Sequence, residues 1–120
     1  MASRSRGRQL ALQVIYQNQF SGKDLEDDFT VFWQGTKADA GTQSYTQHLA
    51  RGVIDQAAEL DMEISAYLVS WTLDRIVVID RIILQIAFYE LVYERDVPWK
   101  VVVDEAVTLG KMFSSDKSTT

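Results

Sequence analysis

The segment from Leu73 to Glu94 constrains the fold most, because its apolar side chains point in nearly every direction around a helical wheel. A helix that is apolar almost all round must be covered by neighbouring helices. The segment therefore predicts the central helix of a bundle, with Thr72 as its N-cap. Only a narrow stripe that contains Asp74, Arg81 and Gln85 is polar, and we expect Arg81 and Gln85 to lie at the surface.

The residues after this segment predict one more helix and then a polar tail. Residues 95–97 form a tight connection, and Pro98 suits the first turn of a helix, where its missing N–H is harmless. That helix extends to Phe113. Four of its side chains recur at helical spacing and are expected to point inward: Val102, Ala106, Leu109 and Phe113. Residues 114–120 carry no packing signal.

The start of the chain predicts two further helices. Apolar residues recur at helical spacing from Arg4 to Phe20, and Gly22 is suited to end that helix. Asp24 can cap a second, short helix, whose first turn would hold the three acidic residues 26–28, where a helix favours negative charge. Residues 35–41 are typical of a loop because of their glycines.

Thr42 is the expected N-cap of a third helix. Its apolar stripe consists of Tyr45, Leu49, Val53, Ala57 and Leu60, and a break is expected near Asp61 or Met62. Strands are not indicated, because the β-branched residues do not alternate with polar ones. The predicted fold class is all-α, in one domain that spans residues 1–120.

The residue types exclude most kinds of catalytic and metal site. The chain has no cysteine, and His48 is its only histidine, so neither a thiolate zinc site nor a histidine metal site can be built. The glycines are scattered and form no phosphate-binding loop. We therefore expect no catalytic residues, no metal and no cofactor, and a binding protein rather than an enzyme.

The charge distribution indicates one basic end on an acidic protein. The formal net charge is −5, which argues against non-specific nucleic-acid binding by the whole surface. Arg4, Arg6 and Arg8 nevertheless lie within five positions. They form either a solvated helix terminus or a phosphate-binding cluster. No segment resembles a signal peptide or a membrane span, so a cytoplasmic protein without membrane contact is expected.

Three segments, in the same order and at similar spacing, resemble the NusB family of bacterial antitermination factors. The first is RSRGRQLALQVIYQNQFSG at residues 4–22. The second combines WTLDR at 71–75 with IDRIILQIAFYEL at 79–91. The third is DVPWKVVVDEAVTLGKMF at 96–113. The most specific parts are AFYEL and the DVPWKV segment that follows it.

This resemblance implies an all-α, NusB-like fold of two small three-helix bundles packed at right angles. It also implies a partner, the small ribosomal-subunit protein NusE, with which the family binds boxA RNA of ribosomal RNA transcripts and helps the RNA polymerase elongation complex resist termination. By position, the implied RNA-binding residues are Arg4, Arg6, Arg8, Gln85, Lys117 and Ser118. The implied protein-partner residues are Tyr16, Asp74 and Asp80.

The sequence departs from the family pattern at two places. Gln85 stands where some members have arginine, and Lys117 where some have aspartate. The family also continues beyond the position of Thr120 with a phenylalanine-containing helix, so we expect the final helix to be missing and apolar surface on the central helix and on Val102 to Phe113 to be uncovered. Such a surface favours self-association, as in a homodimer, or an altered partner surface.

Two alternative functions remain open from the sequence. The chain could be the NusB-like RNA-binding domain of an RNA cytosine methyltransferase, or a helical module that binds only protein.

Overall fold

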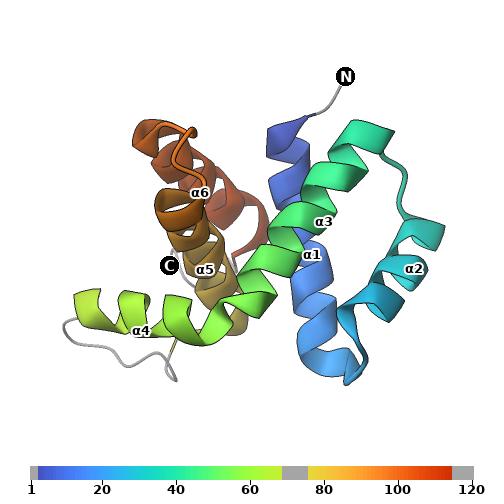
Figure 1. Ribbon diagram of the computed structural model, residues 1–120, viewed down its shortest axis with the longest axis horizontal. Helices are drawn as coiled ribbons and strands as arrows, with labels where there is room; N and C mark the ends of the chain where they lie inside the picture. The colour runs from blue at the N-terminus through green and yellow to red at the C-terminus, as the bar shows by residue number, and fades with distance from the viewer. Residues whose placement is uncertain (1–2, 69–75, 115–120) are drawn as a thin grey trace. The chain divides into compact units, whose positions relative to one another are not determined.

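The structure is a computed structural model that describes residues 3–68 and 76–114, and all regular structure in these ranges is α-helical. The predicted all-α class is thus confirmed. The chain divides into two compact units, which we call unit 1 (Met1–Asp55) and unit 2 (Gln56–Thr120). In the described residues each unit has three helices (Figure 1). That residues 1–120 form one domain stays a prediction.

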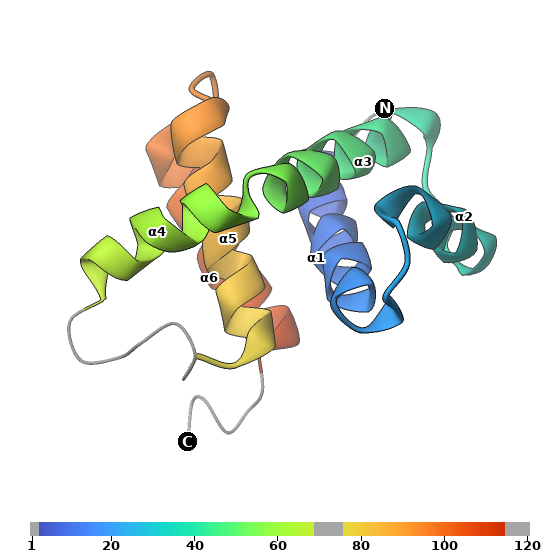
Figure 2. The same ribbon diagram turned by 60° about the horizontal axis from the view of Figure 1, so that its bottom comes forward.

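Unit 1 is built on two helices that lie side by side, α1 (Arg4–Ser21) and α3 (Ala40–Asp55), with the shorter α2 (Leu25–Gly35) against α1 (Figures 1 and 2). Removing apolar side chains from water is the main stabilising contribution to such a unit. Its buried apolar residues are Leu10, Ala11, Leu12, Val14, Ile15, Phe29, Phe32, Leu49, Ala50 and Val53.

Both ends of α1 are capped by local chemistry. The Ser3 hydroxyl accepts a hydrogen bond from the Arg6 N–H at 3.1 Å, which satisfies a donor that the first turn leaves open. Gly22 ends the helix with φ +70°, a left-handed conformation that other residues rarely adopt, and its predicted role is confirmed. Asp24 precedes α2 as predicted, but its side chain makes no capping hydrogen bond.

The predicted start of α3 and the predicted break after it are both wrong. The helix begins at Ala40 because the carboxylate of Asp39 accepts a hydrogen bond from the Thr42 N–H at 2.8 Å and so acts as the cap. Thr42 lies inside the helix, where its hydroxyl accepts from the Ser3 N–H at 3.0 Å. The break falls at Gln56, ahead of the expected Asp61 or Met62.

Unit 2 has α5 (Val78–Tyr93) at its centre, in contact with both α4 (Ala57–Tyr67) and α6 (Trp99–Phe113) (Figure 1). The predicted central helix is therefore confirmed. Its neighbours bury apolar side chains against it, and the buried apolar residues of the unit are Leu60, Ile64, Ile82, Ile83, Ile86, Tyr89, Val97, Val102 and Leu109. Among the described residues, no helix is long and apolar enough to cross a membrane.

The central helix begins later than predicted. Ile76 and Val77 are not helical, so the expected start at Leu73 is wrong, and Thr72 lies outside the described residues. Four β-branched residues follow one another from 76 to 79, and such residues lose side-chain freedom in a helix. Pro98 directly precedes α6, where its carbonyl accepts hydrogen bonds from the N–H groups of Val101 and Val102.

Candidate nucleic-acid interface

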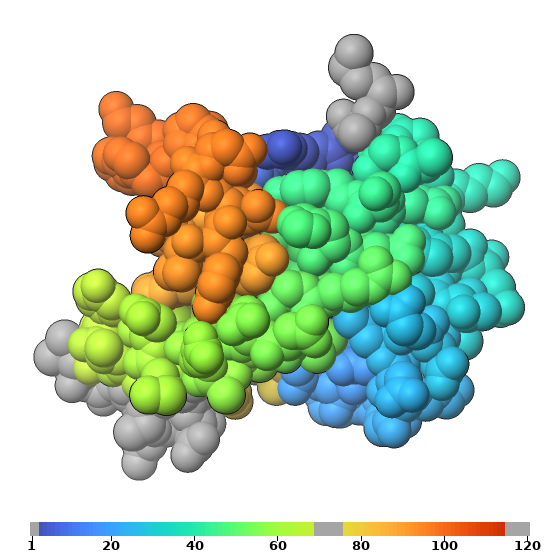
Figure 3. Space-filling view, viewed as in Figure 1, coloured from blue at the N-terminus to red at the C-terminus, as the bar shows by residue number. Residues whose placement is uncertain are grey.

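The arginine cluster occupies the first two turns of α1, and its three members differ in exposure. Arg4 and Arg6 are exposed, whereas only 3% of Arg8 is accessible. The first turns of α1 (dark blue) are visible at the surface beside α3 in the space-filling view (Figure 3). Two guanidinium groups at an open helix terminus are suited to bind phosphate, since guanidinium pairs with its oxygens through paired N–H donors.

The aromatic ring of Tyr45, on α3, lies next to two of these arginines. The Cζ atom of Arg4 is 5.2 Å from the ring centroid, and that of Arg8 is 5.9 Å from it. Both distances fall within the range of cation–π attraction. Arg6 has a different contact, in which its Nη1 donates to the Gln9 Oε1 at 3.3 Å. Tyr45 was expected only as a member of an apolar stripe, and its spacing from the arginines in the sequence gives no sign of this contact.

On α5, Gln85 is held by a carboxylate of α4. Its Nε2 donates to the Asp61 Oδ1 at 2.8 Å, while Arg81 Nη2 donates to the Asp61 Oδ2 at 2.6 Å. Only 4% of Gln85 is accessible, so its expected surface position is wrong. Asp61 lies 24 residues earlier in the chain and was not identified from the sequence. The other predicted RNA-binding residues on this side, Lys117 and Ser118, lie outside the described residues.

The predicted protein-partner residues occupy different helices. Tyr16 is exposed on α1, with its ring centroid 4.9 Å from that of the exposed Phe20. Asp80 is half-buried on the first turn of α5, and its Oδ1 accepts a hydrogen bond from the Ser114 hydroxyl at 2.8 Å. Asp74 lies outside the described residues. Tyr16 thus lies in unit 1 and Asp80 in unit 2.

A shallow apolar groove of about 450 Å³ lies between α5 and α6 in unit 2. Its lining is apolar apart from a few polar groups at the rim, and consists of Asp80, Ile83, Leu84, Ala106, Val107, Gly110, Lys111 and Ser114. Val103 and Val107 of α6 are exposed as well. The expected exposed apolar side chains on α6 are therefore present among the described residues.

The described residues contain no group of three or more His, Cys, Asp or Glu side chains that could hold a metal ion. Together, the six described helices and the arginine-bearing start of α1 define an all-α protein with a basic terminus on an acidic body.

The chain belongs to the NusB family, whose model matches residues 5–120. It is 40% identical over 115 residues to the transcription antitermination protein NusB of Bacillus velezensis, covering 96% of this chain and 85% of that protein. The NusB protein of Pseudothermotoga lettingae is 35% identical over 118 residues, with 98% and 84% covered.

Solved structures of the family share this fold. The NusB structure of T. maritima aligns with a TM-score of 0.84 and 30% identity, covering 98% of this chain and 84% of that one. A crystal structure of antitermination factors NusB and NusE in complex with dsRNA aligns with a TM-score of 0.80 and 22% identity over 95% of this chain and 85% of that one. The recognised family and the NusB-like helical fold are thus confirmed.

Proposed function

We propose that this protein is a transcription antitermination factor that binds boxA RNA of ribosomal RNA transcripts together with the ribosomal protein NusE. The family membership and the antitermination relatives support this function over an RNA methyltransferase domain or a module that binds only protein. The structural observation that carries the proposal is the exposed pair Arg4 and Arg6 at the start of α1.

The charge of the chain explains why a partner is needed. A protein of net charge −5 repels an RNA backbone overall, and its densest group of basic residues is Arg4, Arg6 and Arg8. A basic ribosomal protein would meet the acidic surface favourably and add positive charge for the RNA. In this proposal the protein acts in the cytoplasm, and its role is to bind, not to catalyse a reaction. It reaches the RNA polymerase elongation complex through the RNA and NusE.

The test compares boxA RNA with a scrambled RNA of the same composition, each with and without NusE, over a series of salt concentrations. We expect boxA RNA to bind more tightly than the scrambled RNA, and more tightly with NusE than without it. The affinity should fall as salt rises, because phosphate contacts release counterions. Equal binding of the two RNAs at the same salt would contradict the proposed specificity.

The role of the arginines is tested by replacing Arg4, Arg6 and Arg8 with alanine, singly and together. Each lost phosphate contact should reduce the salt slope by about 0.7, the value for single-stranded RNA. The matched control is Arg95→Ala, which removes an exposed arginine of unit 2. A triple variant with the slope of the unaltered protein would remove the cluster from the interface.

The remaining proposed contacts divide by partner. For RNA these are Lys117 and Ser118, because the Gln85 side chain is only 4% accessible and donates to Asp61 within the fold. For NusE they are Tyr16, Asp74 and Asp80. Exposed Tyr16 suits a protein contact because tyrosine brings a large apolar area and a polar end. We expect Tyr16→Ala to weaken capture of NusE and to leave the salt slope of RNA binding by the assembled complex unchanged.

The apolar groove between α5 and α6 supports a second proposed assembly, a homodimer. Exposed apolar surface favours association, and Val107 is an exposed residue of the groove lining. Light scattering should report a mass above that of one chain, and Val107→Glu should restore the mass of one chain. A single-chain mass for the unaltered protein at high concentration would contradict the homodimer.

A further inference from the structure

The ring of Tyr45 packs directly against the backbone of α1 at Gly7. A Cβ atom added at Gly7 would lie 2.6 Å from the Tyr45 Cδ2, closer than real side chains approach. Gly7 is buried, and it stands between Arg4 and Arg8, which are one helical turn apart. The glycine therefore lets the ring reach α1 at the place where both guanidinium groups lie within 6 Å of its centroid.

The two helices are fixed to one another beside this contact. The Ser3 N–H donates to the Thr42 hydroxyl at 3.0 Å, which joins the residue before α1 to the first turn of α3. Thr46, next to Tyr45, is fully buried, and its hydroxyl, which donates to the Thr42 carbonyl within α3, also lies 3.5 Å from the Gly7 carbonyl of α1. The Tyr45 ring is therefore carried by a part of α3 that is held against α1 by hydrogen bonds and by the burial of Thr46.

Arg4 and Arg8, the two arginines beside the Tyr45 ring, differ in their exposure to solvent and so in their access to RNA. Arg8 is buried, so its guanidinium supports the ring from within the fold. Arg4 is exposed, so its guanidinium is attracted to the ring and still faces solvent. An arginine that is already ordered loses less conformational entropy when it binds a phosphate than one that moves freely.

We propose that Tyr45 is a positioning residue of the RNA interface, which holds the Arg4 guanidinium in place to bind an RNA phosphate. The proposal rests on the function proposed above and adds a residue of α3 to the arginine cluster at the start of α1. Arg8 acts through the Tyr45 ring, and Arg6 acts independently of it.

The test measures binding of boxA RNA to the complex with NusE for Tyr45→Leu, Arg4→Ala and the double variant. Loss of the ring should weaken binding roughly two- to fivefold, the size of a partly exposed cation–π contact. Because Tyr45 acts through Arg4, the double variant should bind no more weakly than Arg4→Ala alone. The losses from Tyr45→Leu and Arg6→Ala should instead multiply.

Two further variants separate the ring from a general effect on folding. Tyr45→Phe keeps the ring and should bind like the unaltered protein. Gly7→Ala keeps every charge and adds one methyl group that displaces the ring, so it should weaken binding as much as Tyr45→Leu. Alanine also favours the helix. The control is Tyr67→Leu, which replaces an exposed tyrosine of α4, and thermal unfolding checks that all variants are folded.

Three outcomes would overturn the positioning role: Tyr45→Leu binds normally, its loss multiplies with that of Arg4→Ala, or Tyr45→Phe binds as weakly as Tyr45→Leu. Failure of the proposed function gives a different result, because Arg4→Ala and Arg6→Ala would then both leave RNA binding unchanged.

Discussion

Asp28 in unit 1 and Asp61 in unit 2 each join two helices, but they do so by different chemistry. Asp28 on α2 is 1% accessible and accepts hydrogen bonds from three neutral side chains of α1: Gln17 at 3.2 Å, Asn18 at 2.9 Å and Ser21 at 2.7 Å. The Asp61 side chain on α4 is 21% accessible and accepts from Arg81 and Gln85 of α5. Asp28 is thus a buried charge that is stabilised by neutral hydrogen-bond donors, whereas Asp61 belongs to a partly exposed ion pair.

The stability of unit 1 therefore depends more strongly on a single polar residue than that of unit 2. Burial acts to raise the pKa of Asp28, but the hydrogen bonds from Asn18, Ser21 and Gln17, with the charge of Lys23, lower it below its ordinary value. The folded state of unit 1 therefore favours the ionised form of Asp28. In unit 2, the burial of apolar side chains is the main contribution to the packing of α4 on α5. The partly exposed ion pair between Asp61 and Arg81 therefore contributes less to stability than Asp28 does in unit 1.

The largest expected effect is that of Asp28→Ala. It leaves three donors of α1 without their acceptor and should lower the free energy of unfolding by about 3 kcal/mol. Urea unfolding measures this loss. The matched control is Asp27→Ala, an exposed neighbour on the same helix, which should change stability by less than about 0.5 kcal/mol. Equal losses of stability in the two variants would show that the buried position of Asp28 has no special importance.

The next effect is a dependence on pH that Asp28→Asn should remove. Because the pKa of Asp28 is lower in the folded state than in the unfolded state, the ionised carboxylate stabilises the fold fully above the unfolded value of about 3.9. That contribution is lost as pH falls through the folded pKa. The stability difference between the protein and Asp28→Asn, about 1–2 kcal/mol at neutral pH, should therefore shrink below about pH 4. A constant difference down to pH 2 would contradict this account.

In unit 2, Asp61→Ala should cost less than Asp28→Ala, because it leaves one buried donor, the Gln85 amide, without its acceptor, where Asp28→Ala leaves three donors. The Arg81 and Asp61 side chains are 38% and 21% accessible, so water screens their attraction. We expect a loss of about 1 kcal/mol. A double-mutant cycle of Asp61→Ala with Arg81→Ala measures the coupling directly. A coupling as large as the loss from Asp28→Ala would mean that unit 2 depends on its polar contact as much as unit 1 does.

Local chemistry explains which parts of the fold were predictable from the sequence. The limits of α1 and the position of α6 follow from periodicity, Gly22 and Pro98, whose effects act within a few residues. Thr42 is a residue type that favours the N-cap position. Asp39 caps the helix instead, by accepting from the Thr42 N–H, and the Thr42 hydroxyl accepts from the N–H of Ser3, 39 residues away. A preference for the cap position could not reveal that distant partner.

The candidate site shows the same limit. Three arginines at equal spacing look equivalent in the sequence, yet Arg8 is buried while Arg4 and Arg6 are exposed. A helical wheel placed Gln85 at the surface because it takes no account of Asp61, which lies on another helix. Asp28 was expected only to favour the start of α2, and its contacts with α1 depend on how the two helices pack.

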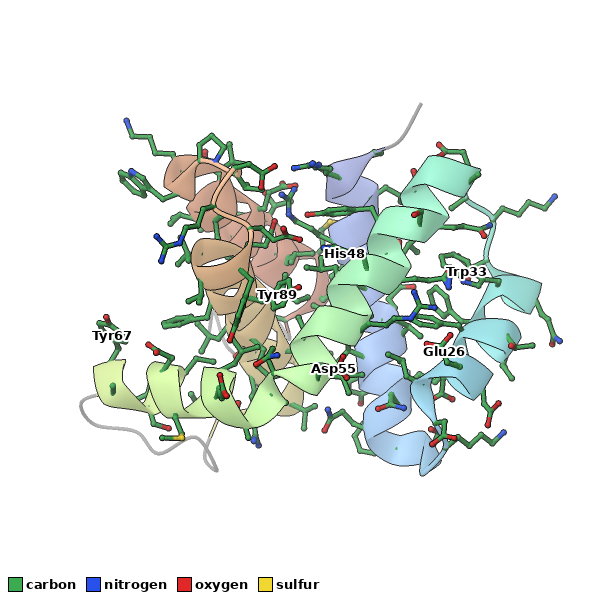
Figure 4. All side chains as sticks on the ribbon, viewed as in Figure 1. Glu26, Trp33, His48, Asp55, Tyr67 and Tyr89 are labelled. Carbon is green, nitrogen blue, oxygen red and sulfur yellow. The ribbon has the colours of Figure 1, made fainter. Side chains whose placement is uncertain are left out.

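The smallest expected effect concerns the ion pair of Glu26, which lies on α2 (labelled in Figure 4). Its partner is Arg51 on α3. Arg51 Nε and Nη2 donate to the two carboxylate oxygens at 2.7 and 2.8 Å, and this contact lowers the pKa of Glu26. The side chains of Arg51 and Glu26 are 46% and 63% accessible. Glu26→Gln should therefore lower the free energy of unfolding by no more than about 0.5 kcal/mol at low salt, and by nothing measurable at 1 M salt.

Arg51→Ala should cost more than Glu26→Gln, because the Arg51 guanidinium also lies 5.1 Å from the centroid of the Phe29 ring. Only the ion-pair part of its loss should disappear in 1 M salt, whereas the contact with the apolar ring should persist. Urea unfolding of both variants at low and high salt separates these parts. If the two variants lose equal stability at both salt concentrations, the contact between Arg51 and the Phe29 ring contributes nothing.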